Sequence, residues 1–242
     1  MYEIALPSVL SAIRVSGQRF DINVPAMIPF SMKVCEVFAS IQGESTYAGL
    51  PCVFIRMTGC NLRCPYCDTV YAYEEGTEVS EGKVINAVES YGITLVEVTG
   101  GEPLLQNATF SLMKKLLDKG LTLLLETNGS MSIRDVDKRA VIIMDIKTPG
   151  SGMSEKMDLH NLDFLKAGDE VKFVILNRED YEWSKGFMRE HSLPQKCKVL
   201  FSPAFGILDP QQLSEWMIHD RLQVRLNLQL HKYLYGPALR RV

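Results

Sequence analysis

Short apolar runs recur along the chain from residue 33 onward, and most of them are apolar without interruption. Runs of this kind, rich in β-branched and aromatic residues, predict buried strands. They fall at residues 34–38, 51–57, 93–98, 121–125, 141–144, 171–176, 198–201 and 224–230. Continuous apolar strands are typical of a parallel sheet that is covered on both faces.

Between these runs the apolar residues recur every three or four positions, which predicts amphipathic helices. The expected helices cover residues 80–91, 110–119, 179–191 and 210–219. The alternation of strands and helices implies an α/β protein with one parallel sheet and right-handed crossovers. About six core strands are fewer than the eight of a closed barrel, so we expect a partial (βα)6 barrel of the TIM type. A flat, doubly wound sheet is the alternative.

The first 31 residues have weak periodicity and contain Pro25 and Pro29. We therefore predict an N-terminal extension over residues 1–31 and a single barrel domain over residues 32–242. The length of 242 residues fits one domain of this type.

Composition and charge exclude some classes of function. The formal net charge of −3 gives no overall basic field for nucleic acid. No apolar run approaches the ~20 residues that a membrane span needs. A signal peptide begins with positive charge and continues with an apolar stretch. Here Glu3 is negatively charged and Pro7 interrupts the apolar stretch. We expect a cytoplasmic protein that binds neither membrane nor nucleic acid directly.

Three of the six cysteines crowd together as Cys60, Cys64 and Cys67, with the spacing Cys-x3-Cys-x2-Cys. In a cytosolic chain such a group indicates a metal site more than disulfides. Thiolates are the usual ligands of iron–sulfur clusters. Three thiolates can hold only three irons of a [4Fe-4S] cube, so the fourth iron is left open for another ligand. The alternative is structural zinc, with Cys35, Cys52 or Cys197 as a fourth ligand.

A second motif, Gly100-Gly101-Glu102-Pro103, follows the strand predicted at 93–98. A glycine pair lets backbone approach a ligand closely, and Glu102 can accept hydrogen bonds from an ammonium group. Together with Tyr66 just before the last cysteine, the two motifs resemble the radical S-adenosylmethionine (SAM) superfamily. That resemblance implies a [4Fe-4S] cluster whose open iron binds SAM.

The resemblance extends to one family, 7-carboxy-7-deazaguanine synthase, over roughly residues 33–237. It is carried by Phe38–Glu44, Phe54–Cys60, Cys67-Asp68-Thr69 and the C-terminal stretch Gln229–Pro237. Members convert 6-carboxy-5,6,7,8-tetrahydropterin to 7-carboxy-7-deazaguanine and release ammonia, as a step of queuosine precursor synthesis. The resemblance implies such a lyase, a flavodoxin-like electron donor and a homodimer.

The family also implies roles for individual residues. Cys60, Cys64 and Cys67 would hold the cluster, and Thr69 would bind Mg²⁺. Substrate contacts are expected at Ile41, Gln42, Gly43, Arg56, Thr99 and Pro237. Expected SAM contacts are Gly101, Glu102, Glu126, Asp145, Ile146, Lys147 and Ser202. The guanidinium of Arg56 suits the substrate carboxylate because it can pair with it in a bidentate way.

Two departures and two competing functions stay open. Some family members end at the proline that matches Pro237, whereas here Ala-Leu-Arg-Arg-Val follows, which puts that substrate contact in doubt. His231 and Lys232 face either the substrate or neighbouring structure. The competing functions are an activating enzyme that forms a glycyl radical on a partner protein, and a non-catalytic zinc-binding module.

Overall fold

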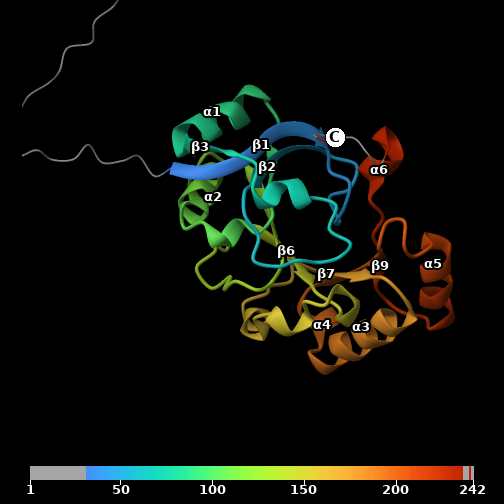
Figure 1. The fold of residues 1–242 in the computed structure, drawn as a ribbon. Coiled ribbons are helices and arrows are strands. Elements are labelled where there is room, and N and C mark those ends of the chain that lie inside the picture. Colours follow the sequence, from blue (N-terminus) through green and yellow to red (C-terminus); the bar gives the residue numbers. More distant parts are fainter. Residues whose placement is uncertain (1–30, 237–239, 241–242) are drawn as a thin grey trace, which may run out of the picture.

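The computed structural model describes residues 31–236 and Arg240, and in that part the chain forms a curved sheet with helices around its outside (Figure 1). The predicted extension over residues 1–31 lies outside the described residues apart from Ser31, which begins the first strand. Within the described part, every helix is too short or too polar to cross a membrane.

Nine strands of the described part form one sheet, in the order β3-β1-β2-β4-β5-β6-β7-β8-β9. Their bounds are Ser31–Ile41 (β1), Pro51–Met57 (β2), Thr77–Ser80 (β3), Leu95–Gly100 (β4), Thr122–Thr127 (β5), Val141–Ile146 (β6), Glu170–Ile175 (β7), Lys198–Pro203 (β8) and Arg225–Leu226 (β9). From β2 through β4 to β9 all neighbours are parallel, as predicted. The prediction is wrong at one edge, where β1 runs antiparallel to β2 and β3, because the loop at 42–50 is too short for a parallel crossover.

The four predicted helices are confirmed as α1 (Glu81–Ser90), α2 (Ala108–Asp118), α3 (Arg178–Glu190) and α5 (Pro210–His219). Two short helices, α4 (Leu193–Lys196) and α6 (Leu230–Tyr235), accompany them. Single 3-10 turns are η1 (Val70–Tyr73), η2 (Pro103–Leu105), η3 (Pro149–Ser151), η4 (Ser154–Lys156) and η5 (Leu159–Asp163).

The strand predicted at 224–230 is wrong beyond Leu226. Asn227 leaves the sheet there, and its side chain bonds elsewhere. Its oxygen accepts from the Ser45 backbone N–H at 2.8 Å, and its amide donates to Ser202 Oγ at 2.8 Å. The Asn227 backbone N–H still donates to the Phe201 carbonyl of β8 at 2.9 Å, but the strand pairing ends there, so the chain turns and enters α6.

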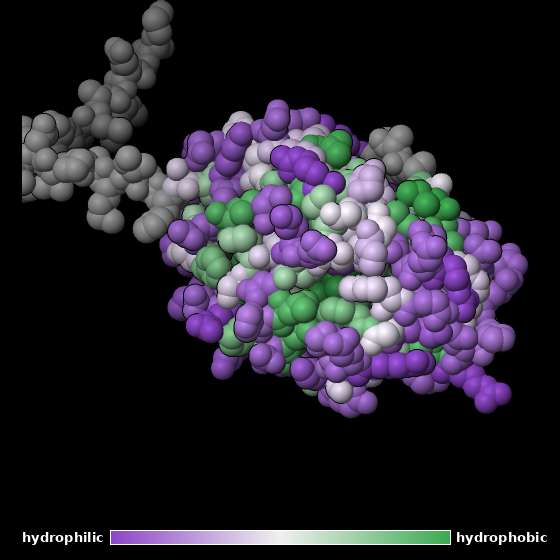
Figure 2. Space-filling model, turned by 60° about the horizontal axis from the view of Figure 1, so that its bottom comes forward, coloured by the Kyte–Doolittle hydropathy of each residue, from purple (hydrophilic) through white to green (hydrophobic). Residues whose placement is uncertain are grey.

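The larger hydrophobic core lies between the sheet and the helices. In β2 it takes the alternate residues Val53, Ile55 and Met57, all fully buried. This is the period of two that a strand imposes, with successive side chains on opposite faces. With these residues inside, polar side chains cover most of the face shown in Figure 2, and apolar ones gather in smaller patches.

The opposite face of the sheet lines the inside of the partial barrel and changes character along each strand. A small apolar core fills its lower part with Phe38, Cys52, Phe54, Leu95, Leu124 and Ile143. The rings of Phe38 and Phe54 stack with centroids 5.1 Å apart. Two residues further along the same strands the inward side chains are polar: Arg56, Glu97, Glu126 and Asp145. The apolar core therefore forms a floor, and the polar residues above it form a site.

Candidate active site

A cavity of about 530 Å³ opens above this floor at the carboxyl ends of the parallel strands. Strands β2, β4, β5, β6 and β8 each contribute polar side chains to its wall. Among them are Arg56, Thr99, Glu126, Asp145 and Ser202. In barrel folds this end of the strands is where active sites are built.

Cys60, Cys64 and Cys67 all line this cavity. They lie in the loop between β2 and η1, where the Cys67 backbone N–H donates to the Cys64 carbonyl at 3.2 Å. Burial raises the pKa of the Cys60 and Cys64 thiols, and neighbouring cysteine charges add to the increase. Three thiols grouped in one loop bind a metal centre as thiolates, and the metal takes up their negative charge. The donor set therefore fits a cluster held at three corners.

The other three cysteines do not supply a fourth ligand. Cys35, Cys52 and Cys197 are not part of the cavity wall. The buried thiols of Cys52 and Cys197 contact backbone carbonyls at 3.6 and 3.7 Å. Across residues 31–236, no three His, Cys, Asp or Glu side chains are arranged to hold a single metal ion. The fourth zinc ligand expected from these cysteines is thus not found among them.

The Gly-Gly-Glu-Pro turn packs directly against the cysteine loop. A Cβ added at Gly101 would lie 2.1 Å from the Gly59 carbonyl oxygen and 2.8 Å from Cys60 Cβ. The Glu102 backbone N–H donates to the same Gly59 carbonyl at 2.7 Å. Only glycine allows this approach, so the turn and the loop form one surface of the cavity.

The Glu102 side chain does not point into that surface, contrary to the expected ammonium contact. It is fully buried and is not part of the cavity wall. Its oxygens accept from the backbone N–H groups of Leu104 at 3.0 Å and Asn128 at 2.7 Å, and from Thr127 Oγ1 at 2.9 Å. Glu102 thus joins the end of β4 to the end of β5 and shapes the site from behind.

Of the three residues expected at the end of β6, two face the cavity. Asp145 and Lys147 line it, and Lys147 Nζ lies 2.8 Å from Asp145 Oδ2. Ile146 belongs to the outer core and is 1% exposed, because a strand turns alternate side chains to opposite faces. The Ile146 side chain therefore does not reach this cavity, and only its backbone could contact SAM.

Two buried polar atoms beside the end of β6 have no hydrogen-bond partner in the described part of the chain. They are Asp145 Oδ1 and the Tyr66 hydroxyl, and both residues line the cavity. Buried polar groups are nearly always satisfied in native proteins. Their position thus suits a polar ligand. Across the cavity, Ser202 lines the wall from the end of β8.

The residues expected to contact substrate form the other side of the cavity. Ile41, Gln42, Gly43, Arg56 and Thr99 all line it. A Cβ at Gly43 would lie 2.0 Å from His231 Nδ1, and the Leu230 N–H donates to the Gly43 carbonyl at 2.8 Å. The loop after β1 is thereby joined to α6. Pro237 lies outside the described residues.

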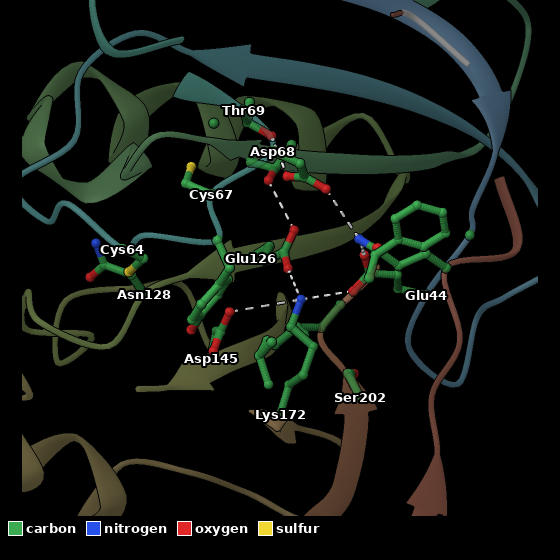
Figure 3. A pocket seen from close by; sticks show the side chains of 18 of the residues that line it. Glu44, Cys64, Cys67, Asp68, Thr69, Glu126, Asn128, Asp145, Lys172 and Ser202 are labelled. Carbon is green, nitrogen blue, oxygen red and sulfur yellow. Dashed lines mark hydrogen bonds and ion pairs between the residues drawn. The ribbon is translucent and has the colours of Figure 1, made fainter. Parts of the chain in front are cut away.

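Thr69 also lines the cavity, and Figure 3 shows it beside Asp68. Its hydroxyl donates to Asp68 Oδ1 at 2.9 Å, which leaves the threonine oxygen lone pairs toward other groups. Asp68 in turn accepts from Lys232 Nζ at 2.5 Å and from Gln229 at 3.3 Å. Burial opposes ionisation, but Lys232 lowers the pKa of Asp68 to about 2. Lys232 is thus bound to the cysteine loop.

Lys172 on β7, a buried charged group of the site that is 5% exposed, was not among the residues predicted from the sequence. Figure 3 shows it pointing up from the floor toward Glu44, Glu126 and Asp145. Glu97, which also lines the cavity, was not predicted either. A lone lysine inside the apolar strand 171–176 was the available signal, since charged residues are almost never fully buried without a partner.

Comparisons with known proteins agree with this geometry. A sequence profile of the radical SAM superfamily matches residues 54–143, which contain the cysteine loop and the Gly-Gly-Glu-Pro turn. The crystal structure of QueE from Escherichia coli superposes with a TM-score of 0.70 at 21% identity, covering 83% of this chain and 95% of that one. The fold and the cysteine site define a radical SAM protein.

Relatives with assigned names show to which family of the radical SAM superfamily the chain belongs. A 7-carboxy-7-deazaguanine synthase from Chlorobaculum tepidum is 44% identical over 214 residues, covering 87% of this chain and 97% of the relative. One from Koribacter versatilis is 41% identical over 226 residues, covering 87% of this chain and the whole relative. The chain belongs to the 7-carboxy-7-deazaguanine synthase family.

Proposed function

We propose that this protein converts 6-carboxy-5,6,7,8-tetrahydropterin to 7-carboxy-7-deazaguanine with release of ammonia. The observation that carries the proposal is a shared cavity. The three cysteines and Gly101 form one side of it, and Gln42, Arg56 and Thr99 form the other. The family relationship supports the same reaction.

The cluster and SAM have matching residues on this chain. Cys60, Cys64 and Cys67 would hold the cluster. Gly101, Glu126, Asp145, Lys147 and Ser202 would surround SAM, with the unpartnered Asp145 oxygen available to its polar groups. When bound, the pair supplies a one-electron source and a group that removes a hydrogen atom from the substrate. The chain's own residues position the reactants and exclude water.

Arg56 is suited to the substrate carboxylate. Its Nε donates to the buried Glu36 carboxylate at 2.7 Å, which fixes the guanidinium plane at the cavity wall. The terminal nitrogens of such a plane pair with a carboxylate through two parallel hydrogen bonds. The carboxylates of Glu44 and Glu126 lie on the same cavity and can accept hydrogen bonds from pterin N–H groups.

Three finer features belong to the same proposal. Thr69 would offer its oxygen to Mg²⁺, which prefers oxygen ligands and keeps several waters that can bridge to a carboxylate. The protein would work as a homodimer and take electrons from a flavodoxin-like donor. All six cysteines are free thiols, which supports a cytoplasmic, reducing location.

Anaerobic turnover tests the proposal. The reconstituted protein is incubated with SAM, dithionite and the carboxytetrahydropterin, and product and ammonia are measured by mass spectrometry and an ammonia assay. We expect both products in equal amounts, with SAM required. A protein that binds four iron and four sulfide per chain yet forms neither product would point to the glycyl-radical alternative. Colourless protein with one zinc would point to the binding module.

A further inference from the structure

Lys172 joins the two sides of the cavity at its floor. It is 5% exposed and projects inward from the middle of β7, level with Asp145, its neighbour in the parallel register. Its ammonium donates to Glu44 Oε2 at 2.8 Å and to Glu126 Oε1, and lies 4.0 Å from Asp145 Oδ2. Three separate elements thus send a carboxylate to one cation (Figure 3).

The carboxylates that Lys172 holds are tied to both sides of the site. The other Glu44 oxygen accepts from Gln229 at 2.9 Å, and the other Glu126 oxygen accepts from Thr99 at 3.0 Å. Both glutamates line the cavity, with side chains 20% and 28% exposed. Each carboxylate oxygen of Glu44 and Glu126 thus accepts one hydrogen bond within the protein and can accept another from a ligand in the cavity.

Acidic groups outnumber the cation at this place. Glu97 joins Glu44, Glu126 and Asp145 on the inner wall. Burial would raise the pKa of Glu44, yet Lys172 lowers it below the usual value. Without the lysine, neighbouring buried carboxylates would repel one another and take up protons. Their orientation toward the cavity would then no longer be fixed.

The geometry does not favour Lys172 as a proton donor to the substrate. Two of its three N–H bonds are directed at carboxylates, and its charge is compensated by three of them. Burial would lower the pKa of Lys172, but the charges of Glu126, Glu44 and Asp145 hold it well above its usual value. A group that releases its proton so reluctantly is a poor general acid.

We propose that Lys172 is a positioning residue, which holds the carboxylates of Glu44 and Glu126 in the orientation that receives the N–H groups of the pterin. The inference rests on the proposed function, because it names the ligand that the carboxylates bind. Lys172 acts through these two residues, so its loss weakens pterin binding while the cluster and SAM sites stay formed.

Binding to the reconstituted, unreduced holoenzyme tests this without turnover. We expect Lys172→Met to raise the Kd for the carboxytetrahydropterin at least about tenfold, since a buried ion pair is broken. Iron content and the Kd for SAM should stay within about threefold of wild type. Lys172→Arg keeps the charge, and we expect it to recover part of the pterin affinity.

A double-mutant cycle separates positioning from general stabilisation. Lys172→Met/Glu126→Gln should lose less pterin affinity than the losses of the two single variants added together, because the lysine acts partly through that carboxylate. The matched control is Lys198→Met, which removes an exposed strand lysine 3.7 Å from Glu170 and should leave the pterin Kd unchanged. Additive losses in the double variant, or an unchanged Kd in a folded Lys172→Met, would overturn the inference.

The pH dependence of kcat/KM on its acidic side gives a further measurement of the role of Lys172. Lys172 (β7) lowers the pKa of Glu44, and the positive form of His231 (α6) acts in the same direction, while Glu97 (β4) and Glu126 (β5) lie nearby. Removing Lys172 should therefore move the acid limb to higher pH, a change that lower stability alone does not produce. Wild-type protein that neither binds nor converts the pterin would refute the proposed function, independently of Lys172.

Discussion

Glu36 and Arg56 face each other across the β1–β2 pair, and Arg56 Nε lies 2.7 Å from a Glu36 oxygen. The Tyr71 hydroxyl donates to the same oxygen at 3.0 Å. A register irregularity between Val34 and Glu36 brings the glutamate opposite the arginine, as β-bulges commonly do near active sites. The guanidinium is therefore held from one side, with the cavity on the other.

Replacing Glu36 by Gln should weaken substrate capture more than it slows turnover. The change keeps the shape of the side chain but removes the charge that orients Arg56. Hydrogen bonds to charged groups contribute about 1.5–3 kcal/mol, so we expect KM for the pterin to rise about tenfold or more. Tyr71→Phe should give a smaller rise. Steady-state kinetics check this, with exposed Glu89→Gln as the control, and an unchanged KM in Glu36→Gln would contradict it.

Cys64→Ala should abolish the cluster and turnover together. Two remaining thiolates hold a cube at only two corners, so iron is lost during anaerobic purification. Visible absorbance and iron analysis measure the cluster. The matched control is Cys35→Ala, a half-buried cysteine outside the cavity, which should keep full iron content. Retention of the cluster and of activity in Cys64→Ala would be incompatible with the proposed ligands.

Gly101→Ala should damage the site through a single methyl group. The new Cβ would lie 2.1 Å from the Gly59 carbonyl, and forced overpacking of this kind costs about 1–3 kcal/mol. We expect a lower Tm and a Kd for SAM raised at least about tenfold. The control is Gly82→Ala on α1, where no atom lies within 4 Å and helix propensity favours alanine. Wild-type SAM affinity in Gly101→Ala would show that the turn is not part of that site.

Glu97→Gln should stabilise the protein at high pH. Burial, together with the charges of Glu126 and Glu44, raises the pKa of Glu97 well above 4.5. The native state therefore keeps a proton that the unfolded chain releases above pH 4.5. Stability falls as pH rises in that window, by up to about 1.4 kcal/mol per pH unit.

Glutamine at this position keeps an oxygen acceptor for the Gln42 amide and removes the titration. Thermal unfolding at pH 5 and pH 8 measures the effect. The gain in Tm over wild type should be larger at pH 8. The same gain at both pH values would show that Glu97 is already ionised in the native state.

Most strands, the main helices and the cysteine motif were predictable because they depend on local patterns. Continuous apolar runs and the spacing Cys-x3-Cys-x2-Cys are both patterns formed by residues close together in the sequence. The Gly-Gly-Glu-Pro turn was found for the same reason. The surroundings of its glutamate could not be predicted, because only the packed structure shows that the N–H groups of Asn128 and Leu104 donate to the Glu102 oxygens.

Lys172 shows why the rest could not be predicted. Its role depends on which face of β7 points inward and on which strands lie next to it, and both follow from sheet closure. Counting alternate residues from Arg56, Thr99 and Glu126 shows that each strand end carries an inward polar group. The sequence contains that pattern. It does not show that residues as far apart as Glu44 and Lys172 meet in one site.

The α6 segment has a consequence for how the site is completed during synthesis. Gln229 contacts both Glu44 and Asp68, Leu230 bonds to the Gly43 carbonyl, and Lys232 holds Asp68. The loop after β1 and the exit of the cysteine loop are thus held by residues that follow all nine strands in the described part of the chain. Until α6 has been synthesised and has packed, the earlier strands can pair while the loop after β1 and the cysteine loop lack these contacts, so the cavity is not yet complete.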